Sequence, residues 1–249
     1  MLHPALLSIG TVILVSLVSF VGILIFSTSE QIIRKSLQYF VSLSAGVLFG
    51  DVFLHILPEL SEGDGISVTT NLILLGGILV SFVIEKIIHW HHCHVLPSAD
   101  HHHPVGALTL FGDGIHNFVD GALIAGAFLV SPTIGYAAAI AIALHEIPQE
   151  ISDFALLIYS GYSRKAALLW NFISALASLA GAALVLGLQG AIPDLSMYLL
   201  AFAGGNFLYI AGADLIPELH KETRLRCALL QLLCICAGIG IMQLIATLE

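Results

Sequence analysis

The chain has 249 residues, of which 58% are hydrophobic and 10% charged, and its mean hydropathy is +0.98. Ordinary soluble domains do not have such a composition, so the sequence predicts an integral membrane protein embedded in a lipid bilayer. The formal net charge is −9. Many of the acids fall inside the predicted spans, so this charge says little about surface partners, and nucleic acid is not expected among them.

Eight apolar segments are long enough to cross a bilayer, which takes about 20 helical residues. In chain order these predicted spans lie near residues 4–26, 37–60, 70–89, 105–130, 134–160, 166–189, 194–219 and 226–247. The first span has no basic residue before it, so we interpret it as a true helix rather than a cleaved signal peptide. The expected fold is an all-α membrane protein with eight transmembrane helices in a single domain over residues 1–249.

The basic residues predict the orientation of the helices. All eight fall on the same side of the predicted spans: Arg34, Lys35, Lys86, Arg164, Lys165, Lys221, Arg224 and Arg226. Lys and Arg concentrate on the cytoplasmic side of membrane proteins. We therefore expect a multi-pass protein of the cell membrane with both termini outside.

A short motif recurs at the ends of the second and seventh spans. Residues 51–60 and 210–219 share a ligand-type residue, two aliphatic residues and Pro-Glu-Leu. The copies are five spans apart, so they run in opposite directions, as in the inverted repeats of secondary transporters. We expect spans 1–3 and 6–8 to form such a repeat around spans 4 and 5, with chance likeness as the alternative.

The repeat places ligand-type residues at both ends of a path. His55 and Glu59 are expected near the outer mouth, and Asp214 and Glu218 near the inner one. The alternative is that the prolines simply end both helices and the two glutamates are solvated beyond them.

Two groups of polar side chains lie midway along the fourth and fifth spans, at residues 116–121 and 145–150. Ionisable groups at membrane depth cost roughly 2.5–3.5 kcal/mol and normally face a bundle interior or a water-filled path. On helices, His116 shares a face with Asp120, and His145 with Gln149. The spans are joined by only three residues, so both groups should lie at a similar depth.

Further acids extend these groups into a polar seam. Asp113 lies one turn before His116, and Glu146, Glu150 and Asp153 form a second stripe on the fifth span. Imidazole and carboxylate ligands suit Zn²⁺ and also Fe²⁺, Mn²⁺ or Cd²⁺. Interhelical hydrogen bonding is the alternative for any one residue, but the number of clustered ligands favours a cation site.

Pro148 interrupts the fifth span beside this seam. A proline in a helix leaves the carbonyl four residues earlier, here that of Leu144, without its usual donor. At membrane depth such a carbonyl is tolerated only where protein or cavity water satisfies it. We expect the opened helix to make room for a hydrated ion.

The segments HNFVDG (116–121) and HEIPQE (145–150) resemble signatures of the ZIP (Zrt-, Irt-like) metal transporters, in the branch whose fifth span reads HExPHE. HILPE (55–59), DLIPE (214–218) and a His-rich loop extend the resemblance over nearly the whole chain. It implies metal-ligand roles for His116, Asn117, Asp120, His145, Glu146, Glu150 and Asn171. Gln149 stands where the branch has His, which leaves open the ion preferred and the second metal position.

The resulting hypothesis is a transporter, not an enzyme, that moves Zn²⁺, with Fe²⁺, Mn²⁺ or Cd²⁺ as further candidates, into the cytoplasm. The metal is its substrate, no cofactor is expected, and the resemblance implies a homodimer. The expected path runs through His55, Glu59, Asp113, Asp153, Asp214 and Glu218. A cytoplasmic loop near residues 89–104 carries His89, His91, His92, His94, His101, His102 and His103. This composition indicates weak metal collection, with a functionless linker as the alternative.

Two other functions were weighed. HEIPQ nearly matches the H-E-x-x-H helix of zinc hydrolases, but Gln149 removes the second His and Pro148 breaks the helical register. An intramembrane zinc-dependent hydrolase is therefore the alternative. A proton-coupled carrier for an organic solute would require a residue that meets the charge of the solute, and no Lys or Arg lies deep in any span to meet an anion.

Overall fold

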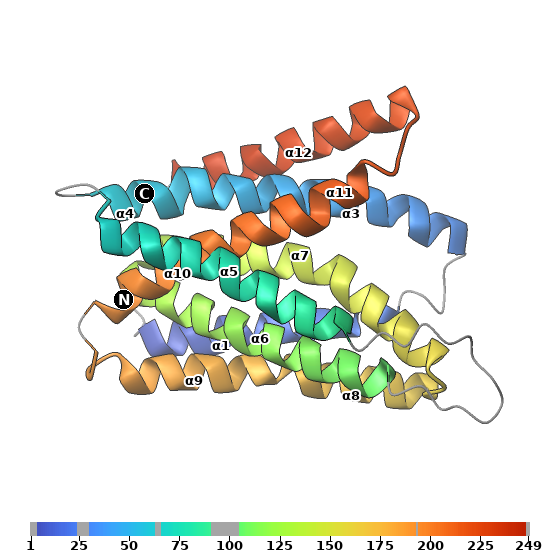
Figure 1. The fold of residues 1–249 in the computed structure, drawn as a ribbon, viewed down its shortest axis with the longest axis horizontal. Coiled ribbons are helices and arrows are strands. Elements are labelled where there is room, and N and C mark those ends of the chain that lie inside the picture. Colours follow the sequence, from blue (N-terminus) through green and yellow to red (C-terminus); the bar gives the residue numbers. More distant parts are fainter. Residues whose placement is uncertain (1–3, 24–29, 63–65, 91–104, 193, 248–249) are drawn as a thin grey trace.

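The computed structural model describes residues 4–23, 30–62, 66–90, 105–192 and 194–247, and every regular element among them is helical (Figure 1). In chain order they are α1 (Pro4–Ser16) and η1 (Leu17–Ile23), α3 (Glu30–Asp51) with η2 (Val52–Ile56) and α4 (Leu57–Ser61), α5 (Val68–Trp90), α6 (Val105–Val130), α7 (Pro132–Tyr159), α8 (Arg164–Ala175) and α9 (Ala177–Leu188), α10 (Leu195–Tyr209) with η3 (Ile210–Leu215) and α11 (Ile216–Leu219), and α12 (Leu225–Ala246). Each predicted span corresponds to one of these helices or to one continuous group of them. The prediction of an all-α membrane fold is confirmed.

Six of the eight spans in the described residues are long and apolar enough to cross a membrane. The other two are α6, with 26 residues, and α7, with 28. Both are long enough to span the bilayer, and both carry the polar groups that interrupt their apolar sequence. The helices that depart from membrane composition are therefore those that hold the candidate site.

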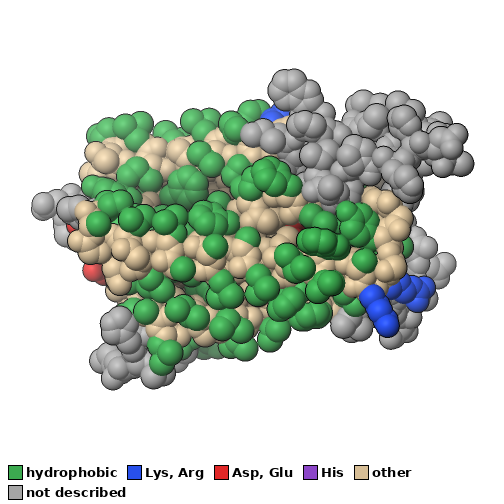
Figure 2. Space-filling model, turned by 90° about the horizontal axis from the view of Figure 1, so that it is seen from below, with side chains coloured by type: hydrophobic (Ala, Val, Ile, Leu, Met, Phe, Trp, Pro, Cys, Tyr) green, Lys and Arg blue, Asp and Glu red, His purple; other side chains and the backbone are tan. Residues whose placement is uncertain are grey.

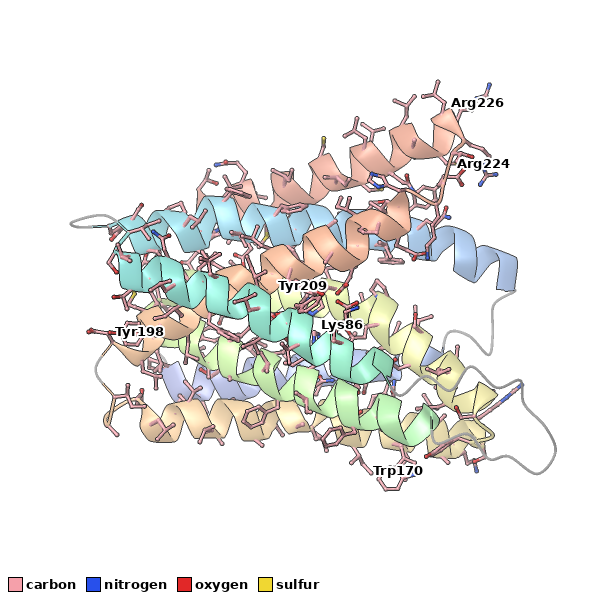
Figure 3. The ribbon with its side chains drawn as sticks, viewed as in Figure 1. Lys86, Trp170, Tyr198, Tyr209, Arg224 and Arg226 are labelled. Atoms are coloured by element: carbon pink, nitrogen blue, oxygen red, sulfur yellow. The ribbon has the colours of Figure 1, made fainter. Side chains whose placement is uncertain are left out.

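The helices run up and down the bundle, so that α1 begins and α12 ends at the same end (Figure 1). We call this the terminus end. Figure 3 shows Arg224 and Arg226 at the other end, where α12 begins, while Tyr198 lies toward the terminus end. Hydrophobic side chains cover much of the face drawn in Figure 2, as expected of a surface that contacts lipid.

The inverted repeat extends from the motif to the packing of the helices. In the α3–α12 pair, a Cβ on Gly46 would lie 2.1 Å from the Ile235 carbonyl oxygen. In the α10–α5 pair, a Cβ on Gly205 would lie 1.9 Å from the Leu74 carbonyl oxygen. Gly46 and Gly205 correspond at the spacing that also aligns Pro58 with Pro217. Each repeat therefore contains the same close approach of two helix backbones, which only glycine permits.

The two motifs also share a local distortion. Each contains a π-helical stretch, η2 or η3, shortly before its proline. Such wider turns occur mostly as short insertions in α-helices and are frequent at functional sites. The sequence likeness between residues 51–60 and 210–219 is thus matched by the same backbone conformation, which argues against a chance resemblance.

Most of the largest buried apolar side chains gather in the half of the bundle nearer the termini, while Phe154 and Leu157 form a smaller cluster near the other end. Phe128, Ile134, Leu48, Ile56 and Leu200 are all less than 2% exposed. They come from α3, η2, α6, α7 and α10, so five elements contribute to this core. It fills the terminus half and leaves the polar seam of α6 and α7 at its inner edge.

Candidate metal centre

Helices α6 and α7 form an antiparallel pair because the chain turns between them within one residue. Ser131 caps α7 by accepting a hydrogen bond from the Ile134 amide at 3.2 Å, and Pro132 follows at the first helical position. The polar groups of the two helices consequently lie at the same depth. The Nε2 atoms of His116 and His145 are 3.2 Å apart.

Four side chains converge at this meeting point: His116, Asp120, His145 and Glu146. His116 Nε2 lies 3.3 Å from Glu146 Oε1 and 3.7 Å from Asp120 Oδ2, and His145 Nε2 lies 3.5 Å from Asp120 Oδ2. Both acids are 2% exposed. Two nitrogens and two carboxylate oxygens within reach of one point form the donor set of a zinc-type site.

The cluster lacks the hydrogen bonds that buried carboxylates normally have. Both oxygens of Asp120 and Oε1 of Glu146 have no hydrogen-bond partner among the described residues. His145 Nδ1 lies 3.1 Å from the Ala141 carbonyl oxygen, so this nitrogen donates and Nε2 presents its lone pair to the cluster. Buried carboxylate oxygens that face one another are stabilised by a proton or a cation between them. The cluster is therefore a candidate cation site.

A second group lies beside the first and shares Glu146 with it. Asp113, Glu146 and Glu150 offer carboxylate oxygens within 4.8 Å of one another. The donors that the structure gives this group are neutral. Asn117 Nδ2 donates to Asp113 Oδ1 at 2.9 Å, and Gln149 Nε2 approaches the same oxygen at 3.4 Å.

Helix α8 completes the second group. Asn171 donates to Glu150, and Ser174 donates to Asp113. Both side chains are at least nine-tenths buried. Ser174 was not among the residues selected from the sequence, because a single serine in an apolar helix is common. Ser174 follows Asn171 by three residues, so both lie on one face of the helix. This spacing is the only feature of the sequence that could have identified Ser174.

The sequence-predicted residues therefore fall into two sets. His116, Asp120, His145 and Glu146 come together as the candidate metal ligands, and Glu150 joins Asp113 in the neighbouring group. The amides of Asn117, Gln149 and Asn171 turn their nitrogens toward the carboxylates of this second group. They surround the acids rather than the two histidines.

The helix around Pro148 shows how its free carbonyl is accommodated. Helix α7 continues through the proline, and the Ser44 hydroxyl from α3 lies 2.7 Å from the Leu144 carbonyl oxygen and 2.8 Å from that of Phe40. The Phe40 carbonyl lies within α3, where helix geometry gives it an amide donor, so the single hydroxyl proton is best used by Leu144. The protein itself thus supplies the missing donor, one of the two possibilities that membrane depth allows. The bond links α3 to α7 one residue before His145.

Two cavities lie on the side of the cluster away from the termini. One, of about 510 Å³, is lined by His145, Pro148, Gln149, Asp214 and Glu218 among others. The other, of about 200 Å³, is lined by Asp113, His116, Gln149, Asp153 and Asp214 among others. The four acids expected along the inner part of the path therefore line one or both cavities. Toward the termini, the buried Phe207 ring lies 6.4 Å from the His145 ring, at the edge of the apolar core.

The residues expected at the outer mouth differ from one another in exposure. His55 is 3% exposed and its Nδ1 lies 3.2 Å from Oδ1 of Asp51, which is itself 1% exposed. Glu59 is half-buried in α4. His55 thus sits inside the terminus half rather than at a solvated opening. Of the His-rich segment, residues 91–104 and the side chain of His89 lie outside the described part of the chain.

These features define a polytopic membrane protein with a buried cluster of candidate metal ligands between two of its helices. The family model described as "ZIP Zinc transporter" matches residues 2–107 and 92–246. The chain belongs to the ZIP zinc transporter family. Its members are transporters, so the chain is not an enzyme, and a metal ion is its transported substrate rather than a cofactor.

Individual relatives support this assignment. Zinc transporter ZIP13 of Pongo abelii is 35% identical over 224 residues, covering 84% of this chain and 66% of the relative. The ZIP13 homolog of Drosophila melanogaster is 31% identical over 283 residues, covering 86% and 78%. Zinc transporter ZIP13 of Homo sapiens is 32% identical over 260 residues, covering 84% and 70%. The chain therefore spans about two thirds to three quarters of the length of these proteins.

Proposed function

We propose that the chain carries Zn²⁺ into the cytoplasm through the site between α6 and α7, with Fe²⁺, Mn²⁺ or Cd²⁺ as further substrates. The observation that carries this proposal is the buried cluster of His116, Asp120, His145 and Glu146, whose carboxylates lack other partners. Two imidazole nitrogens with two carboxylate oxygens suit borderline metals such as zinc better than they suit Mg²⁺ or Ca²⁺.

The neighbouring group bears on ion choice. Asp113, Glu146 and Glu150 supply only oxygen, and the amide of Gln149 lies where an imidazole would add nitrogen. Oxygen ligands favour harder metals such as Mn²⁺ and Fe²⁺ relative to zinc. A metal that bridged both groups through Glu146 would therefore experience a mixed environment, which is why we include these ions among the substrates.

The proposed direction rests on charge and on the position of the cavities. By the positive-inside rule, the basic residues favour a cytoplasmic position for the end opposite the termini. Both cavities and their acids lie toward that end, whereas the apolar core fills the terminus half. We infer a path from His55 and Glu59 through the cluster to Asp113, Asp153, Asp214 and Glu218, and then to the His-rich loop.

The remaining parts of the proposal concern the whole protein. We propose a single transmembrane domain over residues 1–249, located in the cell membrane with both termini outside. A homodimer is the assembly suggested by the resemblance to the family. The segment at about residues 89–104 would collect metal ions as they leave the path.

Purified protein in liposomes tests the central claim. Zn²⁺ is added outside, a fluorescent zinc reporter is enclosed, and the unmodified chain is compared with His145→Ala and Asp120→Ala. We expect uptake with the unmodified chain and at least a tenfold loss with either variant, because each removes a ligand from the cluster. Glu62→Gln, at an exposed position beyond α4, serves as the control. Uptake that survives loss of both ligands would refute the proposed site.

The hydrolase alternative has no support in the site. A zinc hydrolase would need residue 149 to join His145 on the metal, but the Gln149 amide approaches Asp113 instead. Family membership also favours transport over hydrolysis.

A further inference from the structure

The smaller cavity beside the metal centre has a wall that the path described above does not use. It is formed by α5 and by the end of α10, and it carries Ser81, Glu85, Asn206 and Tyr209. The cavity of about 200 Å³ extends from His116 toward this wall. Polar groups of this kind at membrane depth require a ligand, a partner or water.

Asn206 is a buried residue of this wall, and one of its side-chain atoms lacks a hydrogen-bond partner. It is 5% exposed, and its Nδ2 has no hydrogen-bond partner among the described residues. Ser81 Oγ lies 2.8 Å from the Gly77 carbonyl oxygen and 2.7 Å from Asn206 Oδ1. A serine hydroxyl has one proton, so it can donate to only one of these two oxygens.

Turning the Asn206 amide over makes both contacts of the Ser81 hydroxyl hydrogen bonds. The Ser81 hydroxyl then donates to Gly77, and Asn206 Nδ2 donates to Ser81 Oγ. The two ends of an amide are assigned from such hydrogen-bond networks, so this orientation is the one the contacts favour. It leaves the carbonyl oxygen of Asn206 as a buried acceptor without a partner, in the wall of an acidic cavity.

The rest of the lining is suited to a cation. Glu85, Asp113, Asp153 and Asp214 all line the cavity, and no Lys or Arg is among its lining residues in the described chain. Lys86, next to Glu85 in the sequence, is not among the lining residues. Its ammonium lies 5.6 Å from the centre of the Phe82 ring, which in turn packs edge-on against Tyr209 at 6.5 Å (Figure 3).

Tyr209 connects the two helices of this wall. Its hydroxyl donates to Glu85, so α10 fixes the position of a carboxylate on α5. The carboxylates of this wall do not form a compact ligand group like the two described above. An ion here would therefore keep much of its water shell and contact the wall partly through water, and the cavity has room for several waters.

We propose that this cavity is a second cation site, in which Asn206 Oδ1, Glu85 and Asp214 hold a hydrated divalent metal ion. The donors are all oxygen, so the site takes hard ions of the Mn²⁺ and Mg²⁺ class and binds them more weakly than the histidine cluster binds zinc. The role of the site rests on the proposed function, since it gives ions leaving His116 a branch along α5 and α10. Its existence does not depend on transport.

Equilibrium binding of Mn²⁺ tests the site directly. The protein is purified in lipid nanodiscs with Asp120→Ala, His145→Ala and Glu146→Gln, which disable the histidine cluster and remove the carboxylate that the neighbouring oxygen group shares with it. Free Mn²⁺ is measured by its electron paramagnetic resonance signal. We expect Glu85→Gln to weaken Mn²⁺ binding by about tenfold, because a charged oxygen ligand is lost. Glu62→Gln, the same change at an exposed position outside the cavity, should have no effect.

A variant that should bind Mn²⁺ more tightly distinguishes the loss of a ligand from a loss of folding. Asn206→Asp keeps the shape of the side chain and adds a charge, so it should tighten Mn²⁺ binding by about tenfold in the same protein. Equal affinities for Glu85→Gln and Glu62→Gln, or no tightening by Asn206→Asp, would overturn the site. Zinc uptake without Mn²⁺ binding would refute this site alone, whereas Mn²⁺ binding without zinc uptake would refute the proposed transport alone.

Discussion

Gly205→Ala is expected to disrupt the contact between α5 and α10 that positions one wall of the site. An added Cβ would lie 1.9 Å from the Leu74 carbonyl oxygen, whereas ordinary contact begins at 3.4 Å. The two backbones would have to separate by about 1.5 Å. Overpacking of this kind costs about 1–3 kcal/mol, since neither atom belongs to a side chain that can move aside.

The cost should appear as a loss of thermal stability. In a chain of this length, 1 kcal/mol corresponds to a shift of about 2–4 °C, so Tm should fall by roughly 2–12 °C. The assay follows loss of the monodisperse peak by size-exclusion chromatography after heating in detergent. Gly76→Ala, also in α5, is the matched control because nothing lies within 4 Å of its added Cβ.

The same substitution tests the inverted repeat. Gly46→Ala changes the corresponding position in the α3–α12 pair, and Gly240→Ala in α12 is its control, with open space around the added Cβ. We expect Gly46→Ala and Gly205→Ala to lower Tm by similar amounts. Loss of stability in the control variants, or none in either test variant, would show that the close backbone approaches do not hold the bundle together.

Three further predictions address orientation, ion choice and the proline. A cysteine introduced near Asp100 should not react with an impermeant reagent in intact cells, and ready reaction would contradict the proposed cytoplasmic loop. Gln149→His adds a nitrogen ligand beside Asp113, so uptake competition in liposomes should shift toward Zn²⁺ over Mn²⁺; an unchanged preference would place Gln149 outside the metal's ligands. Ser44→Ala removes the donor to Leu144 and should destabilise the protein by about 1 kcal/mol in thermal unfolding, whereas the exposed Ser61→Ala should have no effect.

The sequence predicted the eight spans well because apolar length is a local property. It also predicted the meeting of His116 with His145, since the short link at Ser131 forces α6 and α7 into an antiparallel pair. The glycine contacts could not be predicted in the same way. Gly46 and Gly76 look alike in the sequence, and only the position of a distant helix decides which of them is packed against a backbone.

Side-chain direction was the least predictable part of the site. Asn117, Gln149 and Asn171 were selected as ligand-type residues, but an amide can present either oxygen or nitrogen. In the structure their nitrogens face carboxylates that no basic residue neutralises. Which end of each amide faces the site depends on the combined charge of α6, α7 and α8. The sequence of any one of these helices does not show that charge.

The two copies of the repeated motif show that one sequence pattern can lie in two different environments. His55 and Asp214 occupy the same position in the two copies, and each lies within a π-helical stretch. Yet His55 is buried beside Asp51 within the terminus half, whereas Asp214 is exposed and lines both cavities. The two halves therefore share a sequence pattern and a backbone conformation but differ in access. Since a symmetric pair of motifs would be open or closed together, the difference must come from the packing around them. The two cavities reach the candidate metal ligands from the side away from the termini.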